Sequence, residues 1–485
     1  MKGLMALPAA ALLAGCSMVP HYARPAAPVP ATFANADEAG DAALPSLSYR
    51  DIFRDARLQK LIEQALNNNR DLQIAAANIA AARAQFGIVR AEQLPAIGTT
   101  VSATESDSGT GRTNAGGSPV LGGARTNYNI GSAITSFELD VFGRVRALGE
   151  AQQARLFATQ AVARATRLTL IGDIAAAWLR YAADKSLADI AVRTMVSADN
   201  SVELARIRLE GGIDSLVEMA QARTILATAQ ADLALQKTAI AQDENALRLL
   251  VGAQIDPALL PASIEQAVPG IAVPPVELDS AILLRRPDIV AAEYQLRAAN
   301  AQVGAARAAL FPRLSLTTVA GLASNGLSRL FTGNAFNYSA TPGISYPLFS
   351  GGAGKAGVAQ ARALFDAARA AYEKAIQTGF REVADALARR ATIAQQRTAQ
   401  EALLAAATEN LQLTDLRYRG GIGTHPQWLD AERTRNAAQR GLVDAQLTEA
   451  ANLVTLYRTL GGDALIDAPG GAAKPEPAER QTTPQ

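Results

Sequence analysis

The chain has very few of the side chains from which metal sites and nucleophilic active sites are usually built. Among its 485 residues there are two histidines and one cysteine. His21 lies in a proline-rich stretch and His425 follows a double glycine, so neither has a second histidine at helical spacing. The segment 349–357, FSGGAGKAG, resembles a phosphate-binding loop, but Phe349 replaces the first glycine and Ala356 replaces the serine or threonine. The sequence therefore predicts no enzyme, no metal and no cofactor.

The chain also lacks an excess of charge, a high aromatic content and long apolar runs. Its formal net charge is +1, so the sequence predicts no nucleic-acid partner. Aromatic residues make up 5% and apolar residues 49%, many of them alanine, which is typical of long, closely packed helices. No run approaches the roughly 18 apolar residues of a spanning helix, so a membrane crossing would need a closed β-barrel.

The single cysteine belongs to an export signal. The chain opens MKGLMALPAAALLAGC, with Lys2 followed by a short apolar stretch, which predicts a signal peptide over residues 1–15. The ending Leu-Ala-Gly-Cys resembles a bacterial lipobox, which implies that Cys16 is diacylated and becomes the mature N-terminus. The alternative is an ordinary cleavage site beside a chance cysteine, but that would leave an unpaired thiol in an oxidising compartment. Ser17, by resemblance to bacterial lipoproteins, favours the outer membrane.

Proline-rich stretches divide the mature chain into two halves. Residues 16–50 are expected to be a lipidated tether, 253–276 a linker and 463–485 a disordered tail. The halves between them, 51–252 and 277–462, share matching phrases. RLEGGI at Arg208 and RYRGGI at Arg417 are one such pair, and residues 69–95 align with 286–312. We therefore expect two internal repeats, each reading helix, strand, strand, long helix, helix.

The strands are expected after Pro95 and Pro312. Residues 336–349 alternate between an apolar face and a small polar face, and 126–135 and 314–322 do so less regularly. This pattern is typical of transmembrane β-strands, although a half-exposed strand of a soluble sheet remains an alternative. Residues 102–127 are expected to be a surface loop. Four strands are too few to close a barrel, so several chains would have to share one.

Long helices are expected over 143–210 and 352–419, because neither stretch contains a proline. At ~1.5 Å per residue each would be about 100 Å long. In the first returning helix, apolar residues recur every seven positions, which is coiled-coil spacing; they are Leu226, Leu233, Ile240 and Leu247.

The repeated Gly-Gly phrase predicts the turn at the tip of each helical hairpin. Glycine tolerates the left-handed conformation in which helices end. Each tip is followed by residues in capping-box spacing. The tip residues are Gly211, Gly212, Gly420 and Gly421, and the caps pair Ser215 with Glu218 and Thr424 with Gln427.

The chain as a whole resembles the TolC-like outer-membrane efflux proteins, in their NodT/OprM-like lipoprotein branch. The resemblance rests on YARPAAPVP (22–30), FELDVFGR (137–144), LLRRPDIVAAEYQLRAANAQVGAARAALFPRLSL (283–316), PLFSGG (347–352) and the RYRGGI…LDAER stretch (417–433). It implies a mixed α/β membrane protein: a homotrimer in which four strands per chain form one twelve-stranded barrel and the helices form a periplasmic tunnel.

The resemblance also implies a function and partners. The chain would be the exit duct of a tripartite efflux pump, anchored in the cell outer membrane through Cys16 and extending into the periplasm. It would conduct drugs or other small toxic compounds passively, working with a periplasmic membrane-fusion adaptor and an inner-membrane RND-type transporter. A duct for type I protein secretion and a periplasmic helical scaffold are the alternatives.

A periplasmic gate is the last implication of the resemblance. Tyr418 and Asp430 fall where the family motif places a gate tyrosine and a constriction aspartate, and Glu218 where the first hairpin would have an acidic partner. Arg417 and Arg419 would supply the positive charge, since Gly423 stands in place of an arginine and Gln427 in place of a second aspartate. Glu218 acting only as a helix cap, and Asp430 as a solvated residue, are the alternatives.

Overall fold

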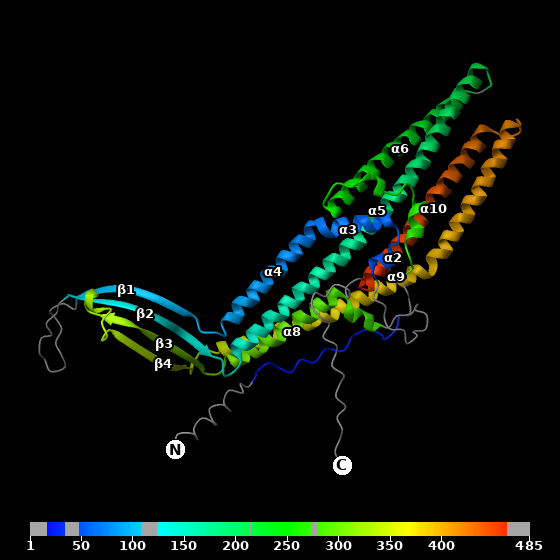
Figure 1. The fold of residues 1–485 in the computed structure, drawn as a ribbon. Coiled ribbons are helices and arrows are strands. Elements are labelled where there is room, and N and C mark those ends of the chain that lie inside the picture. The colour runs from blue at the N-terminus through cyan, green and yellow to red at the C-terminus, as the bar shows by residue number, and fades with distance from the viewer. Residues whose placement is uncertain (1–16, 34–47, 108–123, 214, 274–279, 463–485) are drawn as a thin grey trace, which may run out of the picture. The chain divides into compact units, whose positions relative to one another are not determined.

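The computed structural model describes residues 17–33, 48–107, 124–213, 215–273 and 280–462. They form a mostly helical chain with one four-stranded sheet (Figure 1). The chain divides into two compact units. The described residues within 1–26, 78–159 and 292–372 belong to the first, and those within 27–77, 160–291 and 373–485 belong to the second. Cys16, the tail and the centre of the expected loop at 102–127 lie outside the described residues.

The sheet of the first unit is an antiparallel meander of four strands. They are β1 (Ile97–Asp107), β2 (Ala124–Leu139), β3 (Arg313–Ser324) and β4 (Phe336–Ser345), paired in that order. β2 and β3 approach closely at two glycines, because a Cβ on Gly321 would lie 2.5 Å from Cα of Gly131. The expected loop over 102–127 is wrong at both ends. Asp107 still pairs with Ala124, because backbone pairing continues through the polar residues that suggested a loop.

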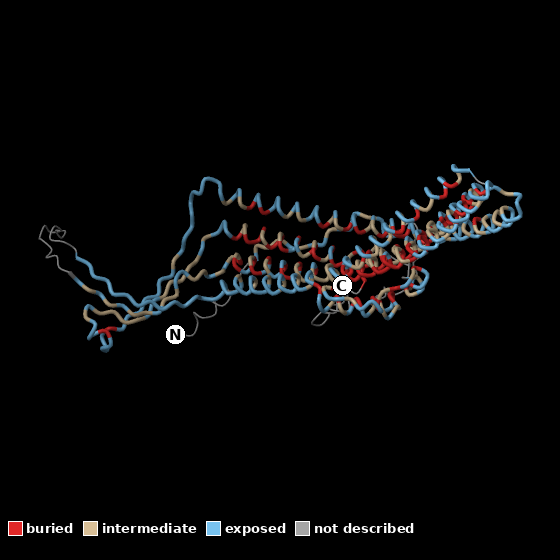
Figure 2. The backbone as a smooth tube through the Cα atoms, turned by 90° about the horizontal axis from the view of Figure 1, so that it is seen from above, coloured by how far each residue is buried: buried red, intermediate tan, exposed pale blue. Residues whose placement is uncertain are grey.

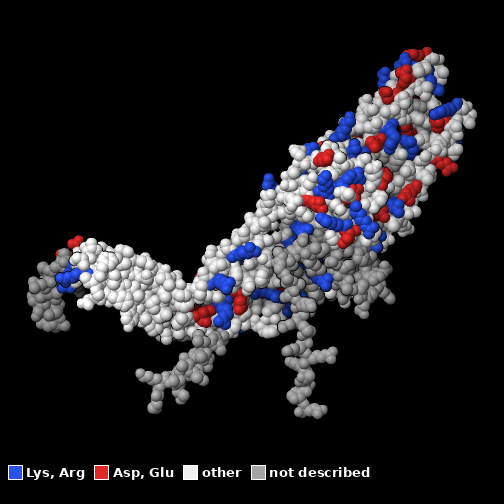
Figure 3. Space-filling view, viewed as in Figure 1, with Lys and Arg blue, Asp and Glu red and all other residues white. Residues whose placement is uncertain are grey.

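Charge is confined to the ends of these strands. β1 carries Glu105 and Asp107, β2 carries Arg125 and Glu138, and β3 carries Arg313. The residues between them are uncharged, and Figure 3 shows the sheet as an almost uncharged surface, whereas Lys, Arg, Asp and Glu are scattered over the helices. The four strands therefore share an uncharged band.

The start of the proline-rich stretch packs in the first unit rather than hanging free. It lies along α8 (Pro287–Ala308), where Nδ2 of Asn300 donates to the carbonyl oxygen of Pro20 at 2.8 Å. Arg24 and Arg297 both pair with Glu293, at 2.8 and 2.7 Å, and Glu293 is only 5% exposed. These contacts differ from the expected loose tether, because a buried carboxylate here needs cationic partners and Arg24 supplies one.

The second unit has an apolar core built largely around the middle of a long helix. Trp178 is fully buried there and donates from Nε1 to the carbonyl oxygen of Leu259 at 3.1 Å. Phe53 and Tyr457 meet edge-on with ring centroids 5.2 Å apart. The short helices of this unit are α2 (Tyr49–Ile52), α3 (Ala56–Asn68), η1 (Pro257–Leu259), α7 (Ile264–Ala267), η2 (Val268–Gly270) and η3 (Ser280–Arg285). Much of the expected 253–276 linker is thus packed structure.

Two helical hairpins complete the fold, and their helices match the expected spans closely. α5 (Arg144–Glu210) and α9 (Ala353–Arg419) each have 67 residues, and each begins one residue after the expected start. α6 (Leu216–Val251) and α10 (His425–Thr459) return alongside them, and α4 (Arg70–Ala91) precedes β1 as α8 precedes β3. The order helix, strand, strand, long helix, helix therefore occurs twice. Figure 2 shows buried segments recurring along the helices, with mostly exposed and intermediate residues along the strands.

The first returning helix, α6, carries the expected seven-residue spacing. On α6 the buried stripe includes Ala222, Ala229, Leu233 and Leu247, alternating with residues that are partly buried. None of the helices in the described ranges is long and apolar enough to cross a membrane.

Candidate functional site at the hairpin tips

Both tips end their first helix with a pair of glycines. Gly211 and Gly212 follow α5, and Gly420 and Gly421 follow α9. The second glycine of each pair takes the left-handed conformation, with φ of 71° at Gly212 and 72° at Gly421. A residue with a Cβ would be strained in that conformation, so the glycines fix where each hairpin turns.

Glu218 lies in the first tip and its carboxylate is held by the helix cap. The backbone N–H of Ser215 donates to Oε2 of Glu218 at 2.6 Å, and Glu218 N–H lies 3.5 Å from the Ser215 hydroxyl. The hydrogen bond from the Ser215 backbone is the main cause of the lowered pKa of Glu218, and the charges of Arg208 and His425 contribute further. The cap is therefore sufficient to explain Glu218, although its charge also acts on the second tip.

Tyr418 lies in an aromatic cluster of the second tip. Its ring centroid is 5.5 Å from that of His425 and 6.4 Å from that of Trp428, and the His425 and Trp428 rings are stacked at 5.8 Å. Arg208, from the end of α5, lies over the Tyr418 ring with its guanidinium carbon 5.7 Å from the centroid. This cluster joins the two hairpins, and His425 within it is only 8% exposed.

Asp430 and the arginines of the second tip are not brought together. Asp430 accepts from Arg433 on its own helix at 2.9 Å, and both side chains are about 70% exposed. Arg419 pairs with Asp415, also at 2.9 Å. The carbonyl oxygen of Arg417 accepts the N–H groups of Ile422 and Gly423, at 3.0 Å each. Within one chain, Asp430 and Arg419 are thus each paired within their own helix.

Asp430 instead lies on a groove between α6 and α10. The groove has a volume of about 630 Å³ and is lined mainly by aliphatic side chains, including Leu216, Val217, Ile225 and Leu429. Gln221, which the repeat alignment pairs with Asp430, lines the same groove. The two returning helices therefore present corresponding positions to one cavity.

Three members of the tip cluster escaped sequence reasoning: Arg208, His425 and Trp428. His425 is one of two histidines and Trp428 one of two tryptophans, so rarity was a signal that could have marked them. Arg208 stands in the repeated phrase, where it aligns with Arg417. Its contact with Tyr418, however, depends on how the two hairpins pack, which the sequence does not reveal.

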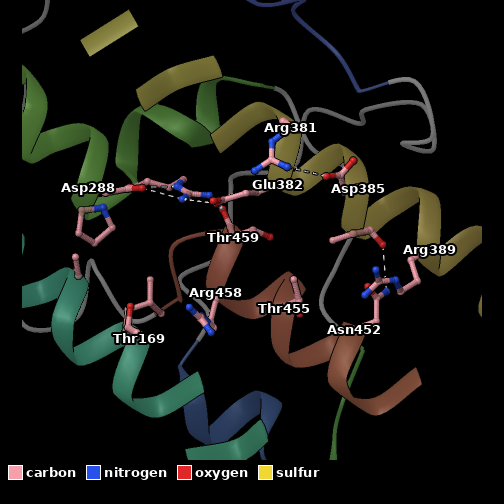
Figure 4. Close-up of a pocket in the computed structure, with 15 residues that line it drawn as sticks. Thr169, Asp288, Arg381, Glu382, Asp385, Arg389, Asn452, Thr455, Arg458 and Thr459 are labelled. Carbon is pink, nitrogen blue, oxygen red and sulfur yellow. Dashed lines mark hydrogen bonds and ion pairs between the residues drawn. The ribbon is translucent and has the colours of Figure 1, made fainter. Parts of the chain in front are cut away.

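A second pocket lies where α8 begins. Its lining includes Arg286, Pro287 and Asp288 of the Arg-Arg-Pro-Asp run at 285–288. It has a volume of about 500 Å³, and Figure 4 shows Asp288, Glu382 and Thr459 around it, from α8, α9 and α10 respectively. Arg286 is 8% exposed and pairs with Asp288 and Glu382 at 2.8 Å each, while its Nη1 donates to the carbonyl oxygen of Thr459 at 3.1 Å. Arg286 therefore contacts residues of three helices, α8, α9 and α10.

Comparison with known proteins identifies the family. The model of the outer membrane efflux protein family matches residues 61–253 and 278–462, so the chain belongs to that family, as its sequence motifs indicated. It is 38% identical over 459 residues to the solvent efflux pump outer membrane protein SrpC of Pseudomonas putida, covering 93% of this chain and 96% of SrpC. It is 36% identical over 474 residues to the outer membrane protein OprJ of Pseudomonas aeruginosa, covering 95% of each.

A solved structure agrees with this assignment. The open-state crystal structure of the MtrE outer membrane channel of Neisseria gonorrhoeae superposes with a TM-score of 0.83 at 34% identity, covering 93% of this chain and 99% of MtrE. The protein is thus an outer-membrane efflux protein with a channel-type fold, and its location is the cell outer membrane. The family comparisons point to channels rather than enzymes.

Proposed function

We propose that the chain is the exit duct of a tripartite efflux pump, which conducts small toxic compounds passively out of the cell. The uncharged band of the four strands is the observation that supports this most directly. β2 is uncharged from 126 to 137 and β4 over its full length, which suits the ~9–11 residues of a strand crossing a bilayer. A periplasmic scaffold would have no reason to exclude charge from the middle of every strand.

Three chains would be needed to complete the duct. A single four-stranded sheet leaves β1 and β4 with unpaired edges, and an unpaired backbone group costs several kcal/mol in lipid. Three sheets joined edge to edge would give twelve strands and remove those edges. α4 has no buried residue within the chain, which suits a helix that packs on a neighbouring copy.

The pump assignment rests on the family and on the names of its relatives. SrpC is named for a solvent efflux pump and a protein called ArpC for an antibiotic efflux pump. Solvents and antibiotics are therefore the substrate classes that we propose. The partners would be a periplasmic adaptor and an inner-membrane RND-type transporter, with Cys16 as the lipid anchor. The halves 51–252 and 277–462 would be two repeats of one ancestral unit, and the hairpin tips the periplasmic gate.

A deletion strain tests this function. Loss of the gene should lower resistance to toluene and to a panel of antibiotics, and a plasmid copy should restore it. If resistance is unchanged while export of a secreted protein fails, the type I secretion duct replaces the efflux duct. The trimer is tested separately, since light scattering of mild-detergent extracts should give about three times the 50.6 kDa chain mass. A monodisperse, fully folded monomer would contradict it.

A further inference from the structure

A carboxylate occupies a core position of the seam of α6. Core positions along this helix alternate in steps of three and four: Ala222, Leu226, Ala229, Leu233, Gln236, Ile240, Asp243 and Leu247. Asp243 is only 8% exposed at this position, and coiled coils normally keep core positions apolar. A charged group placed there is costly unless it is paired or takes up a proton.

Asp243 meets a second carboxylate, that of Asp184 on α5. Oδ2 of Asp243 and Oδ2 of Asp184 are both buried, and within the described part of the chain neither has a hydrogen-bond donor. Two ionised carboxylates can only accept, so they repel each other across the seam. When one of them is protonated it donates to the other, and the same contact becomes a hydrogen bond.

The groups around the pair do not neutralise it. From α5, Nε of Arg180 lies 3.5 Å from Oδ1 of Asp243, but its side chain is 71% exposed, so solvent weakens that attraction. Burial raises the pKa of Tyr181, also on α5, and the charges of Glu244 and Asp243 raise it further. Glu244 itself pairs with Arg248 on α6. From α10, Asp444 adds negative charge facing Asp184, and Arg440 opposes it while pairing with Asp232 at 2.9 Å.

We propose that Asp184 and Asp243 form a proton-operated lock between α5 and α6, closed when the two carboxylates share a proton and loosened when both are ionised. Burial, followed by the contact with Asp184, raises the pKa of Asp243 to about 7, which places the transition near neutral pH. A raised folded-state pKa means that the folded hairpin binds the proton more tightly than the opened one. The lock is therefore fully closed below the ordinary aspartate pKa of ~3.9 and is lost as pH rises through 7. It does not depend on the proposed duct.

Hydrogen exchange on the full-length protein in detergent tests the lock. Peptides covering 180–190 and 236–250 are compared at about pH 5.5 and 8.5, after correction for the intrinsic pH dependence of exchange. For a carboxyl with a pKa of about 7 in the closed state and ~3.9 in the opened state, linkage predicts an opening equilibrium on the order of 30-fold larger at the higher pH. Infrared difference spectra should show a protonated carboxyl band that disappears near pH 7.

Asp243→Asn should abolish both signals, and Asp184→Asn should weaken them. In Asp243→Asn an amide replaces the protonated carboxyl, so opening should become independent of pH, and the infrared band should be absent. Asp184→Asn removes the repulsion but leaves Asp243 buried, so it should weaken the pH dependence and move it to lower pH, which keeps the test decisive if the Asp243 variant does not fold. Glu244→Gln, one position away and paired within α6, is the matched control and should behave like the wild type. Full wild-type pH dependence in the foldable aspartate variants would overturn the lock.

Discussion

The guanidinium of Arg208 lies over the ring of Tyr418, 5.7 Å from its centroid, and so links the end of α5 to the end of α9. In the repeated phrase Arg208 aligns with Arg417, the residue just before Tyr418, so the contact joins neighbouring positions of the two tips. A cation–π contact at a partly exposed site is worth about 0.5–1 kcal/mol. The contact is therefore weak enough to break during opening and strong enough to bias the tips together.

Arg208→Ala should raise single-channel conductance in planar bilayers, because it removes the cation–π contact between the first hairpin and Tyr418. The closed state should become less favourable by about 0.5–1 kcal/mol, which is a two- to fivefold change in the opening equilibrium. Arg206→Ala is the matched control, since Arg206 pairs with Glu203 and Glu210 on its own helix α5. Equal conductance in both variants would show that the Arg208–Tyr418 contact does not hold the tips.

Cys16→Ala should abolish labelling of the protein by radioactive palmitate. The basis is the lipobox and the absence of any other cysteine. Resistance in this variant is expected to survive in part, because strands in the membrane would provide a second means of attachment. Ser17→Ala is the control and should keep its label. Equal label in the wild type and Cys16→Ala would end the proposal of a lipid anchor.

Glu432→Gln should stabilise the protein at neutral pH. Glu432 is 7% exposed, and burial raises its pKa despite a hydrogen bond with Ser197. A raised folded-state pKa contributes stability that is present below the ordinary value of ~4.3 and is lost as pH rises through the folded value. The glutamine has no charge to bury. The unfolding free energy of the Glu432→Gln variant should therefore exceed that of the wild type by about 1 kcal/mol at pH 8, and the two values should converge in acid.

Thermal unfolding followed by circular dichroism between pH 5 and 8 measures this difference. Glu409→Gln, on the exposed surface of α9, is the control and should leave the pH profile of stability unchanged. A Glu432→Gln variant that is less stable than the wild type at pH 8 would mean that the carboxylate is better solvated than its burial indicates.

The sequence predicted the helices well because their ends are marked by residues with strong local effects. Absence of proline, paired glycines and the Ser215–Glu218 cap act within a few residues of their own position, so α5 and α9 were placed almost correctly. The strand ends were missed because residues 102–107 are polar and resemble a loop, whereas the ladder to β2 is made by backbone groups that the sequence does not reveal.

Contacts between distant elements could not be predicted in the same way. The seven-residue spacing of Leu226, Leu233, Ile240 and Leu247 identified one row of core positions on α6, and the other row was overlooked because Gln236 and Asp243 interrupt it. Arg208 meeting Tyr418 depends on how two hairpins pack. Similarly, the pairing of Arg286 with Glu382 and Thr459 depends on how α9 and α10 pack beside it.

Arg286→Ala should destabilise the protein by about 2 kcal/mol. Arg286 is 9% exposed at its side chain, and its removal leaves Glu382 and the carbonyl oxygen of Thr459 without their cation. Breaking a buried pair costs about 3–5 kcal/mol, but Glu382 is 36% exposed, so water compensates in part. Arg286→Lys should recover only part of the loss because it lacks the planar fork. Arg285→Ala, exposed and adjacent, should unfold like the wild type in a denaturant titration.

Asp430→Ala should raise single-channel conductance and increase sensitivity to large antibiotics such as vancomycin, if Asp430 narrows the periplasmic end of the duct. In the structure Asp430 pairs with Arg433 at 2.9 Å and lines the groove between α6 and α10. Each such exposed pair is worth about 0–1 kcal/mol, so three copies around an axis would bias closure by only a few kcal/mol. A partner that binds the open tips more tightly by that amount would be sufficient to open them.

Arg433→Ala separates the two roles of Asp430. It breaks the Asp430–Arg433 pair but keeps the aspartate, so conductance should stay near the wild-type value if the carboxylate itself forms the constriction. It should rise as in Asp430→Ala if the pair holds α10 in place. Gln221→Ala, at the corresponding position on α6, should have no effect because no charge is lost. Unchanged conductance in Asp430→Ala, and again when it is combined with Arg419→Ala, would place the gate at other residues, with the Arg208–Tyr418 contact as the next candidate.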